Sequence, residues 1–365
     1  MTLFLCGDVM TGRGIDQILP HPSGHQIFEP YVQDAREYVE LAEARNGPTA
    51  KPVTGSYIWG DALAEFERIG PDARIINLET SITAGDDYWR GKGINYRMHP
   101  ENMECLTAAR IDACALANNH VLDYGYSGLA ETLETLMRAG LKTVGAGRSL
   151  AEAGAPAIVP LADGIWVIVF AFGTESSGIP PSWAAREDRA GIDFLADLSE
   201  MTAAAIVERV RRVRGQRDLV VASIHWGTNW GYDVPRDHVR FAHWLVDGGV
   251  DIVHGHSSHH PRPIEVYRSR LILYGCGDLI NDYEGIEGYE QYRDDLVLMY
   301  FATLSPATGE LTALHMTPMQ IRKLKLNKVS EPDAQWLRER LQRTCAPVRS
   351  QIDLMPNGTL TLQWR

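Results

Sequence analysis

Four histidines lie within seven residues, from His254 to His260, directly after the mostly apolar run 250–253. A short run of this kind, followed at once by Gly255 and polar residues, is typical of a buried strand that ends at a functional edge of a sheet. Imidazole is neutral near pH 7 and binds Zn, Mn, Fe, Co and Ni, so the cluster predicts a metal site. A histidine-rich surface loop without ligands is the alternative that the cluster alone leaves open.

The same pattern of an apolar run followed by small or polar residues occurs at four other places in the chain. The runs are 2–6, 73–76, 114–117 and 219–224, and the residues that follow them include Asp8, Glu79, Asn119, His120 and His225. Each polar residue alone is more typical of a turn or a helix cap. Together they predict that the carboxyl ends of parallel strands deliver oxygen and nitrogen ligands to one open site. Such a set suits a transition metal with bound water better than a closed structural zinc site.

Helical spacing of apolar residues alternates with these runs along the chain. We expect helices over 28–45, 127–139, 199–213 and 236–246, and strands that begin near 141, 219 and 250. Alternation of strands and helices is typical of the α/β class. Because the motifs extend from residue 8 to residue 278, one domain over 1–310 must hold the whole site. Residues 311–365 are predicted to form a small appendage, with a strand at 311–321, a helix at 333–343 and a hairpin turn at 356–358.

Five motifs in this order resemble the CapA family of poly-γ-glutamate and polyglutamine synthesis proteins, within the calcineurin-like metallophosphatase superfamily. They are Gly7-Asp8-Val9-Met10-Thr11-Gly12-Arg13, Asn77-Leu78-Glu79, Asn118-Asn119-His120, His225-Trp226-Gly227 and Gly255-His256-Ser257-Ser258-His259. The resemblance covers about residues 3–280, including the strand end at 273–278. It implies a metallophosphatase-like four-layer α/β/β/α sandwich.

The resemblance also implies roles for individual residues. Asn119, His225 and His256 would hold one metal, whereas Asp8, Glu79 and His259 would lie toward a second metal or the catalytic water. His120 would be the proton donor, with Asp8 or Glu79 as the base. The predicted cofactor is therefore one or two divalent ions of Mn, Zn, Fe, Co or Ni.

Two positions depart from the phosphatase pattern. Met10 stands where those enzymes have a histidine, and Asn77 with Glu79 replaces their bridging aspartate. Fewer ligands at one metal weaken the two-metal clamp on phosphorus, so phosphate ester cleavage is less favoured. One divalent ion still polarises a carbonyl group and lowers the pKa of water, which suits chemistry at an amide.

Candidate substrate-binding residues lie around these motifs. The guanidinium of Arg13 can grip a carboxylate or a phosphate, although a structural ion pair is equally consistent with its position. Arg97 belongs to the irregular segment 92–99, which is either a recognition segment or an ordinary solvated loop. Trp226, together with the aromatic residues at 230 and 232, either lines a pocket or packs in the core. The segment 174–183, rich in Gly, Pro and Ser, is a candidate substrate lid or a simple connector.

Charge and hydropathy exclude some classes of protein. The 365 residues have a formal net charge of -12 and no basic run, so nucleic acid is not an expected partner. No run of 18 apolar residues and no signal sequence is found, so we expect no membrane span and a cytoplasmic location. The odd number of cysteines and the lack of a Cys-x-x-Cys spacing fit a reduced compartment. An acidic chain suits a polyanionic polymer only if the metal and the arginines create local positive charge.

The sequence thus predicts a metal-dependent enzyme with acid/base chemistry on a peptide or a poly-γ-glutamyl amide. Hydrolysis in polyglutamate or polyglutamine metabolism is the first hypothesis. The alternatives are epimerisation at a peptide Cα in a ribosomal peptide pathway, phosphoester cleavage, and a non-catalytic accessory role.

Overall fold

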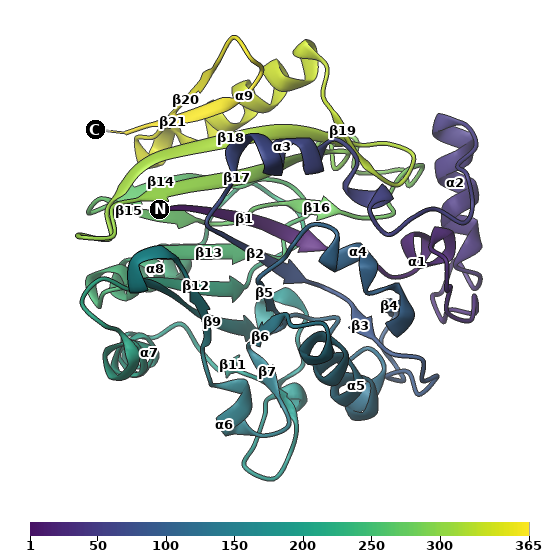
Figure 1. Ribbon diagram of the computed structural model, residues 1–365, viewed down its shortest axis with the longest axis horizontal. Helices are drawn as coiled ribbons and strands as arrows, with labels where there is room; N and C mark the ends of the chain where they lie inside the picture. Colours follow the sequence, from purple (N-terminus) through teal and green to yellow (C-terminus); the bar gives the residue numbers. More distant parts are fainter. Residues whose placement is uncertain (365) are drawn as a thin grey trace.

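The computed structural model describes residues 1–364, and two large sheets face each other in it (Figure 1). The order of strands in the larger sheet is β20-β21-β18-β17-β1-β2-β5-β6, with β16 beside β1 and β19 beside β18. Its strands are β1 (Thr2–Val9), β2 (Ala73–Leu78), β5 (Ala113–Ala115), β6 (Lys142–Val144), β16 (Asp278–Ile280), β17 (Leu296–Leu304), β18 (Leu311–Ile321), β19 (Leu326–Lys328), β20 (Gln351–Leu354) and β21 (Leu360–Gln363).

The smaller sheet has the order β11-β9-β12-β13-β15-β14, with β8 beside β9. Its strands are β8 (Ala157–Pro160), β9 (Trp166–Thr174), β11 (Phe194–Leu195), β12 (Leu219–His225), β13 (Ile252–His256), β14 (Ile264–Tyr267) and β15 (Arg270–Leu273). Two short pairs complete the strands: β3 (Ser81–Ile82) with β4 (Arg97–Met98), and β7 (Ala146–Gly147) with β10 (Gly191–Ile192).

Alternation of side chains along the central strands explains why the sheets stack. On β12, Val220, Ala222 and Ile224 pack against the helices α7 (Glu200–Val213) and α8 (Arg236–Asp247). Leu219 and Val221, on the opposite face, belong to the core between the two sheets. Because successive side chains of a strand point to opposite faces, a strand that is apolar throughout requires a layer on each side.

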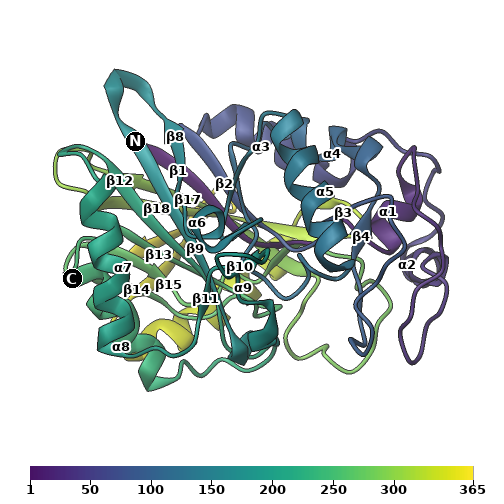
Figure 2. The same ribbon diagram turned by 90° about the horizontal axis from the view of Figure 1, so that it is seen from below.

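The other helices lie on the outer face of the larger sheet and around the ends of the sandwich (Figure 2). They are α1 (Gly14–Ile18), α2 (Arg36–Asn46), α3 (Ala62–Ile69), α4 (Glu104–Thr107), α5 (Gly125–Arg138), α6 (Leu150–Ala153) and α9 (Glu331–Cys345). With α7 and α8 on the far side, the order of layers is helix, sheet, sheet, helix. The predicted four-layer α/β/β/α sandwich is confirmed.

A cluster of three aromatic rings attaches α3 to the larger sheet. Phe66 of α3 lies edge-on to Phe4 of β1, with 4.7 Å between ring centroids, and Phe301 of β17 lies 6.4 Å from Phe66. We expect Phe66→Ala to lower the free energy of unfolding by about 3–5 kcal/mol, because it leaves a cavity in a fully packed core. Urea denaturation measures this loss, with Met201→Ala, at an 80% exposed side chain of α7, as the matched control. A loss below about 1 kcal/mol for Phe66→Ala would contradict this account of the packing.

The elements predicted from periodicity are present with one displaced boundary. The helices expected over 127–139, 199–213 and 236–246 correspond to α5, α7 and α8. The helix expected over 28–45 is wrong in its first part, because α2 begins only at Arg36. Phe28 instead stacks on Tyr88 with centroids 3.5 Å apart, and Gln26 forms a bridge to Asp34. The apolar residues before Arg36 therefore serve tertiary contacts rather than a helical face.

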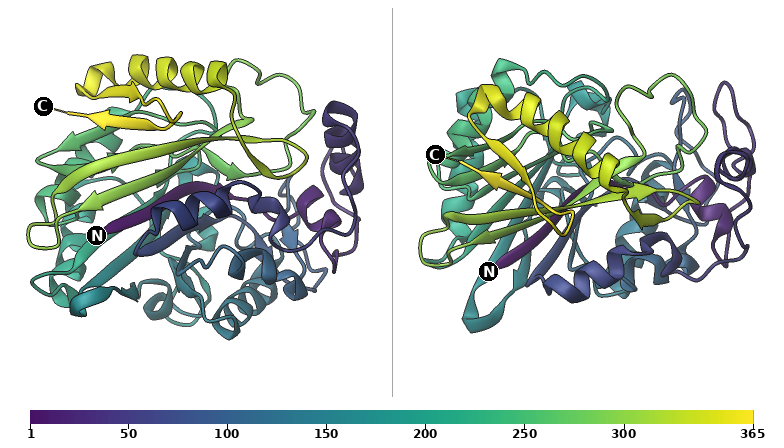
Figure 3. Two further views of the ribbon diagram at one scale, coloured as in Figure 1. Left: turned by 45° about the horizontal axis from the view of Figure 1, so that its top comes forward. Right: turned by 90° about the horizontal axis from the view of Figure 1, so that it is seen from above.

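The segment from residue 311 contains the predicted strand, helix and hairpin as β18, α9 and the β20–β21 pair. Figure 3 shows α9 beside β20 and β21 at the end of the sandwich. β18 pairs with β17 along nearly its whole length, and β21 pairs with β18. These strands thus extend the larger sheet, and the division at residue 310 stays a prediction.

Candidate metal centre

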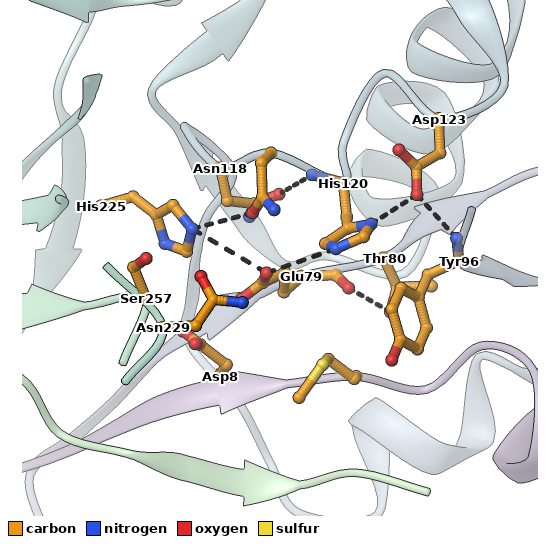
Figure 4. Close-up of polar contacts among 12 residues, drawn as sticks. Asp8, Glu79, Thr80, Tyr96, Asn118, His120, Asp123, His225, Asn229 and Ser257 are labelled. Carbon is orange, nitrogen blue, oxygen red and sulfur yellow. Dashed lines mark hydrogen bonds and ion pairs between the residues drawn. The ribbon is translucent and has the colours of Figure 1, made fainter. Parts of the chain in front are cut away.

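The carboxyl ends of parallel strands from both sheets meet around one group of polar side chains (Figure 4). In the larger sheet Asp8 lies in register with Asn77 of β2 and with Asp278 of β16. In the smaller sheet His225 of β12 lies in register with His256 of β13. Both histidines stand on the face of their strands that points to the other sheet, so they meet the carboxylates across the interface.

A chain of hydrogen bonds fixes the protonation of His256. His254 Nε2 lies 2.6 Å from the carbonyl oxygen of Cys6, which can only accept, so this nitrogen carries the proton. Burial lowers the pKa of His254 to about 4 and that of His256 well below its usual value, so both rings are neutral at pH 7. His254 Nδ1 therefore accepts from Ser223 Oγ at 3.1 Å, and Ser223 Oγ accepts from His256 Nε2 at 2.8 Å. His256 Nδ1 is left without a proton.

A neutral His225 cannot satisfy both of its neighbours. His225 Nδ1 lies 2.8 Å from the unprotonated Nδ1 of His256, and His225 Nε2 lies 2.9 Å from Asn119 Oδ1. Burial lowers the pKa of His225 well below its usual value, so the ring has a single N–H. Whichever nitrogen carries that proton, the other one faces a second acceptor at close range. A divalent cation bound to one nitrogen of His225 removes this conflict, because the other nitrogen then carries the proton and donates it to the acceptor on its own side.

Two buried carboxyl groups face the same histidines. Asp8 offers a ligand atom within 4.8 Å of those of His225 and His256. Its Oδ1 accepts from Asn77 Nδ2 at 2.7 Å, whereas its buried Oδ2 has no N–H or O–H donor among the described residues. Burial, and then the charge of Asp278, raises the pKa of Asp8 to about 7, and burial followed by Asp8 raises the pKa of Glu79 well above its usual value. A cation would neutralise this concentration of acidic groups.

A second group, formed by Asp8, His259 and Asp278, is already hydrogen-bonded. His259 Nδ1 lies 2.8 Å from Asp278 Oδ1, and His259 Nε2 lies 2.9 Å from Asn229 Nδ2. Asp278 Oδ2 accepts from Asn281 Nδ2 at 2.7 Å. Burial disfavours the charged ring, but Asp278, Asp8 and Asp294 together outweigh burial, so the pKa of His259 is raised. An ion there would have to replace one of these hydrogen bonds, so the arrangement fits one metal at the His225 side better than two.

His120 lies beside this group as a separate candidate for acid/base chemistry. Its Nε2 is 3.7 Å from Glu79 Oε1, and its Nδ1 is 2.6 Å from Asp123 Oδ2, which can only accept. Lys92 forms an ion pair with Asp123 and lies 2.9 Å from His120 Nδ1. Burial lowers the pKa of His120 to about 4, with Asp123 opposing and Lys92 adding to the shift. The neutral ring thus donates from Nδ1 to Asp123 and has an unprotonated Nε2 on the Glu79 side.

The two arginines that are candidates for substrate binding form ion pairs with other residues of the protein. The buried guanidinium of Arg13 forms ion pairs with Glu29 at 3.0 Å and with Asp282, between the rings of Tyr38 and Tyr96. That of Arg97 pairs with Asp86 and donates to the carbonyl oxygens at 24 and 85. Neither guanidinium contacts a candidate metal ligand within residues 1–364.

Trp226 is likewise not brought to the centre. It is fully buried on the α7–α8 side of β12, where it stacks on His238, and its Nε1 donates to the carbonyl oxygen of Tyr274 at 3.1 Å. Trp230, by contrast, lies beside the candidate ligand His259, with ring centroids 5.4 Å apart.

Sequence reasoning missed Asp278, Asp123 and Lys92 as members of the site. Asp278 ends the motif 273–278 and carried a signal, since it follows a strand as Asp8 does. Asp123 lies three residues after His120, a spacing that allows an Asp–His pair in a helical turn. Lys92 belongs to a segment singled out for its charges, but nothing local indicates that it reaches His120.

Two facing sheets with a buried histidine and carboxylate group at their carboxyl edge define a metallophosphatase-like α/β protein. Residues 2–283 match the family described as bacterial capsule synthesis protein PGA_cap, and the chain belongs to this CapA family. The predicted family is confirmed.

Three relatives illustrate the range of similarity. A probable polyglutamine synthesis accessory protein of Mycobacterium tuberculosis is 48% identical over 361 residues, which cover 99% of this chain and 95% of the relative. The PGA biosynthesis protein CapA of Bacillus subtilis is 27% identical over 88% of this chain and 74% of its own length. The capsule biosynthesis protein CapA of Bacillus anthracis is 23% identical over 82% of this chain and 63% of its own length. Within residues 1–364, the structure has no helix long and apolar enough to cross a membrane.

Proposed function

We propose that this protein is a metal-dependent hydrolase that cleaves an amide bond in a glutamyl polymer or peptide. The observation that supports the metal is the pair of acceptors at His225, His256 Nδ1 and Asn119 Oδ1, which a single N–H cannot satisfy with the Asn119 amide as it is oriented in the structure. The observation that supports acid/base chemistry is the neutral His120, oriented by Asp123 and open at Nε2.

Asp8, Asn119, His225 and His256 would hold the ion, with Glu79 beside them. When bound, a divalent ion there would polarise the amide carbonyl group and lower the pKa of a water molecule. His120 Nε2 can take up a proton during attack and return it to the leaving nitrogen. Asp123 would stabilise the imidazolium ion that exists between these two transfers, while Lys92 holds Asp123 in place.

The glutamyl substrate is proposed from the relatives, whose names refer to polyglutamine and PGA synthesis. A hydrolase in such a system would trim or release chains. The local cations near His120 give an anionic substrate a place to bind in an acidic protein.

The test incubates the protein, loaded with Mn or Zn, with a γ-linked glutamate tetramer, a glutamine peptide and p-nitrophenyl phosphate in deuterated water. We expect mass spectrometry to find shorter glutamyl fragments. His120→Gln should reduce the rate at least about 100-fold, because it removes proton transfer, while His315→Gln at an exposed position should not.

Each other outcome overturns the hydrolase proposal in favour of a stated alternative. Deuterium at Cα without cleavage would indicate an epimerase, and phosphate release would indicate a phosphoesterase. If metal-loaded protein turned over none of these substrates, the result would favour a non-catalytic accessory role, the role that the name of the M. tuberculosis relative states.

A further inference from the structure

A cavity of about 450 Å³ opens beside His120, between two segments that are far apart in the sequence. We name it the Lys92 cavity. Its walls include Trp89, Arg90 and Lys92 on one side and Glu175, Pro181 and Trp183 on the other. The volume is in the range of roughly 300–1,000 Å³ that is typical of sites for small ligands.

Both walls are attached to the candidate centre by hydrogen bonds. On one side, Trp89 N donates to the carbonyl oxygen of Asp123 at 2.7 Å, and Lys92 contacts both Asp123 and His120. On the other side, the hydroxyl groups of Thr174 and Ser177 donate to the carbonyl oxygen of His225 at 3.2 and 3.0 Å. The cavity is thus held in a fixed position next to the reacting groups.

The two walls meet at their aromatic residues, and Gly178 of the second wall lies close to the candidate ligand Asn119. Trp89 packs edge-on to Trp183, with centroids 5.3 Å apart. A methyl group built on Gly178 would lie 3.8 Å from Asn119 Nδ2, so this wall approaches the centre directly. A ligand in the cavity would therefore have one end near Asn119 and His120.

Donors in the cavity are left without acceptors. An ammonium group has three N–H bonds, and Asp123 is the one acceptor that Lys92 contacts within residues 1–364, because His120 Nδ1 itself carries a proton, so donors remain free. Arg90 is exposed and has no carboxylate within ion-pair distance in residues 1–364. The buried Nε1 of Trp183 also has no acceptor among the residues that the structure describes. A carboxylate is the ligand that such donors recognise best, because hydrogen bonds between charged groups are the strong ones.

The other large cavity near the centre is lined by more acidic than basic residues. It measures about 460 Å³ and lies beside Asn281, on the Asp278 side. Its charged residues are Glu284, Glu287, Glu290, Asp294 and Asp295, against Arg45, Arg293 and Arg322. Arg293 is already paired with Asp295 and Asp333, so an anionic chain would be repelled there.

From this contrast we infer that the Lys92 cavity binds a carboxylate of an acidic peptide chain and places the next amide bond at His120. This inference rests on the proposed function for the identity of the reaction, but the binding itself does not require turnover. Arg90 would be a specificity residue that selects anionic chains, and Lys92 would join the carboxylate to the Asp123–His120 pair.

The test measures binding by calorimetry in the metal-loaded His120→Gln variant, so that the ligand is not consumed. The probes are a γ-linked glutamate tetramer and the same tetramer with its α-carboxylates amidated. We expect the charged tetramer to bind and Arg90→Ala to raise its Kd on the order of 10-fold, with little effect on the amidated tetramer. Arg90→Glu should raise the Kd further, because it repels the carboxylate.

Two control variants make the result specific to this cavity. Arg211→Ala removes an exposed arginine of α7, and Arg322→Ala removes a cation from the other cavity. An unchanged Kd in Arg90→Ala, a larger loss in Arg322→Ala, or equal binding of the two tetramers would overturn the inference. Cleavage by the wild type with no effect of Arg90→Ala would retain the hydrolase and exclude the subsite. The expected binding pattern without cleavage would retain the subsite and contradict the hydrolase proposal.

Discussion

Replacement of both His225 and His256 by alanine is expected to remove the divalent metal that the wild-type protein retains after dialysis. Elemental analysis should find about one equivalent of Mn, Zn, Fe, Co or Ni in the wild type and almost none in the double variant. The physical reason is the excess of acceptors around His225, whose Nδ1 lies 2.8 Å from the unprotonated Nδ1 of His256. The loss should be nearly complete, because two of the four proposed ligands are removed.

Thermal stability gives a second readout of the same prediction. A metal that binds only the folded state at 100 times its Kd adds about 2.7 kcal/mol, so the wild type should show a large metal-dependent rise in Tm. The double variant should show none. His21→Ala with His315→Ala, at two exposed histidines, is the matched control.

One alternative arrangement satisfies His225 without a cation. If the amide of Asn119 were turned, its Nδ2 would donate to His225 Nε2, and His225 Nδ1–H would donate to His256. Wild-type protein that binds no metal after reconstitution would support that arrangement. It would also contradict the proposed metal centre.

Asp123→Asn is expected to reduce kcat by about 100- to 10,000-fold while metal content stays unchanged. Asp123 accepts the Nδ1 proton of His120 and pairs with Lys92, so an amide in its place no longer fixes the ring with Nε2 unprotonated. KM should change little, because Asp123 is fully buried beneath His120 and is not expected to contact the substrate.

Steady-state kinetics on the glutamyl substrate, combined with elemental analysis, measures both quantities. Asp86→Asn is a suitable control, since Asp86 is 88% exposed and its one ion pair within residues 1–364 is with Arg97. If kcat in Asp123→Asn stayed within twofold of the wild type at equal metal content, His120 would not be the proton-transfer residue.

The set of candidate ligands could be proposed from sequence because each ligand lies at, or a few residues after, the carboxyl end of a strand. A run of apolar residues fixes where a parallel strand ends, and the carboxyl ends of such strands share one edge of a sheet. For this reason Asp8, Asn119, His225 and His256 meet in the structure, although they are spread over most of the chain. Helix positions followed from periodicity for the same local reason.

Contacts between distant segments could not be predicted in this way. The segment before Arg36 has helical spacing, yet Phe28 stacks on Tyr88 instead. Arg13 and Arg97 were candidates for substrate binding, with a structural ion pair or a solvated loop left open, and their guanidinium groups pair with Glu29, Asp282 and Asp86. Charge alone does not determine which partner a long side chain contacts, because several oppositely charged groups lie within its reach.

The sequence by itself determined the class of fold, the family and the residue types at the strand ends, since these depend on local pattern and order along the chain. Only the tertiary structure decided which acceptors face one another at His225, how Asp123 and Lys92 orient His120, and which cavity carries free cationic donors. Hydrogen-bond donors and acceptors act over about 3 Å, a distance set by how the two sheets and their loops pack and not by the spacing of residues in the chain.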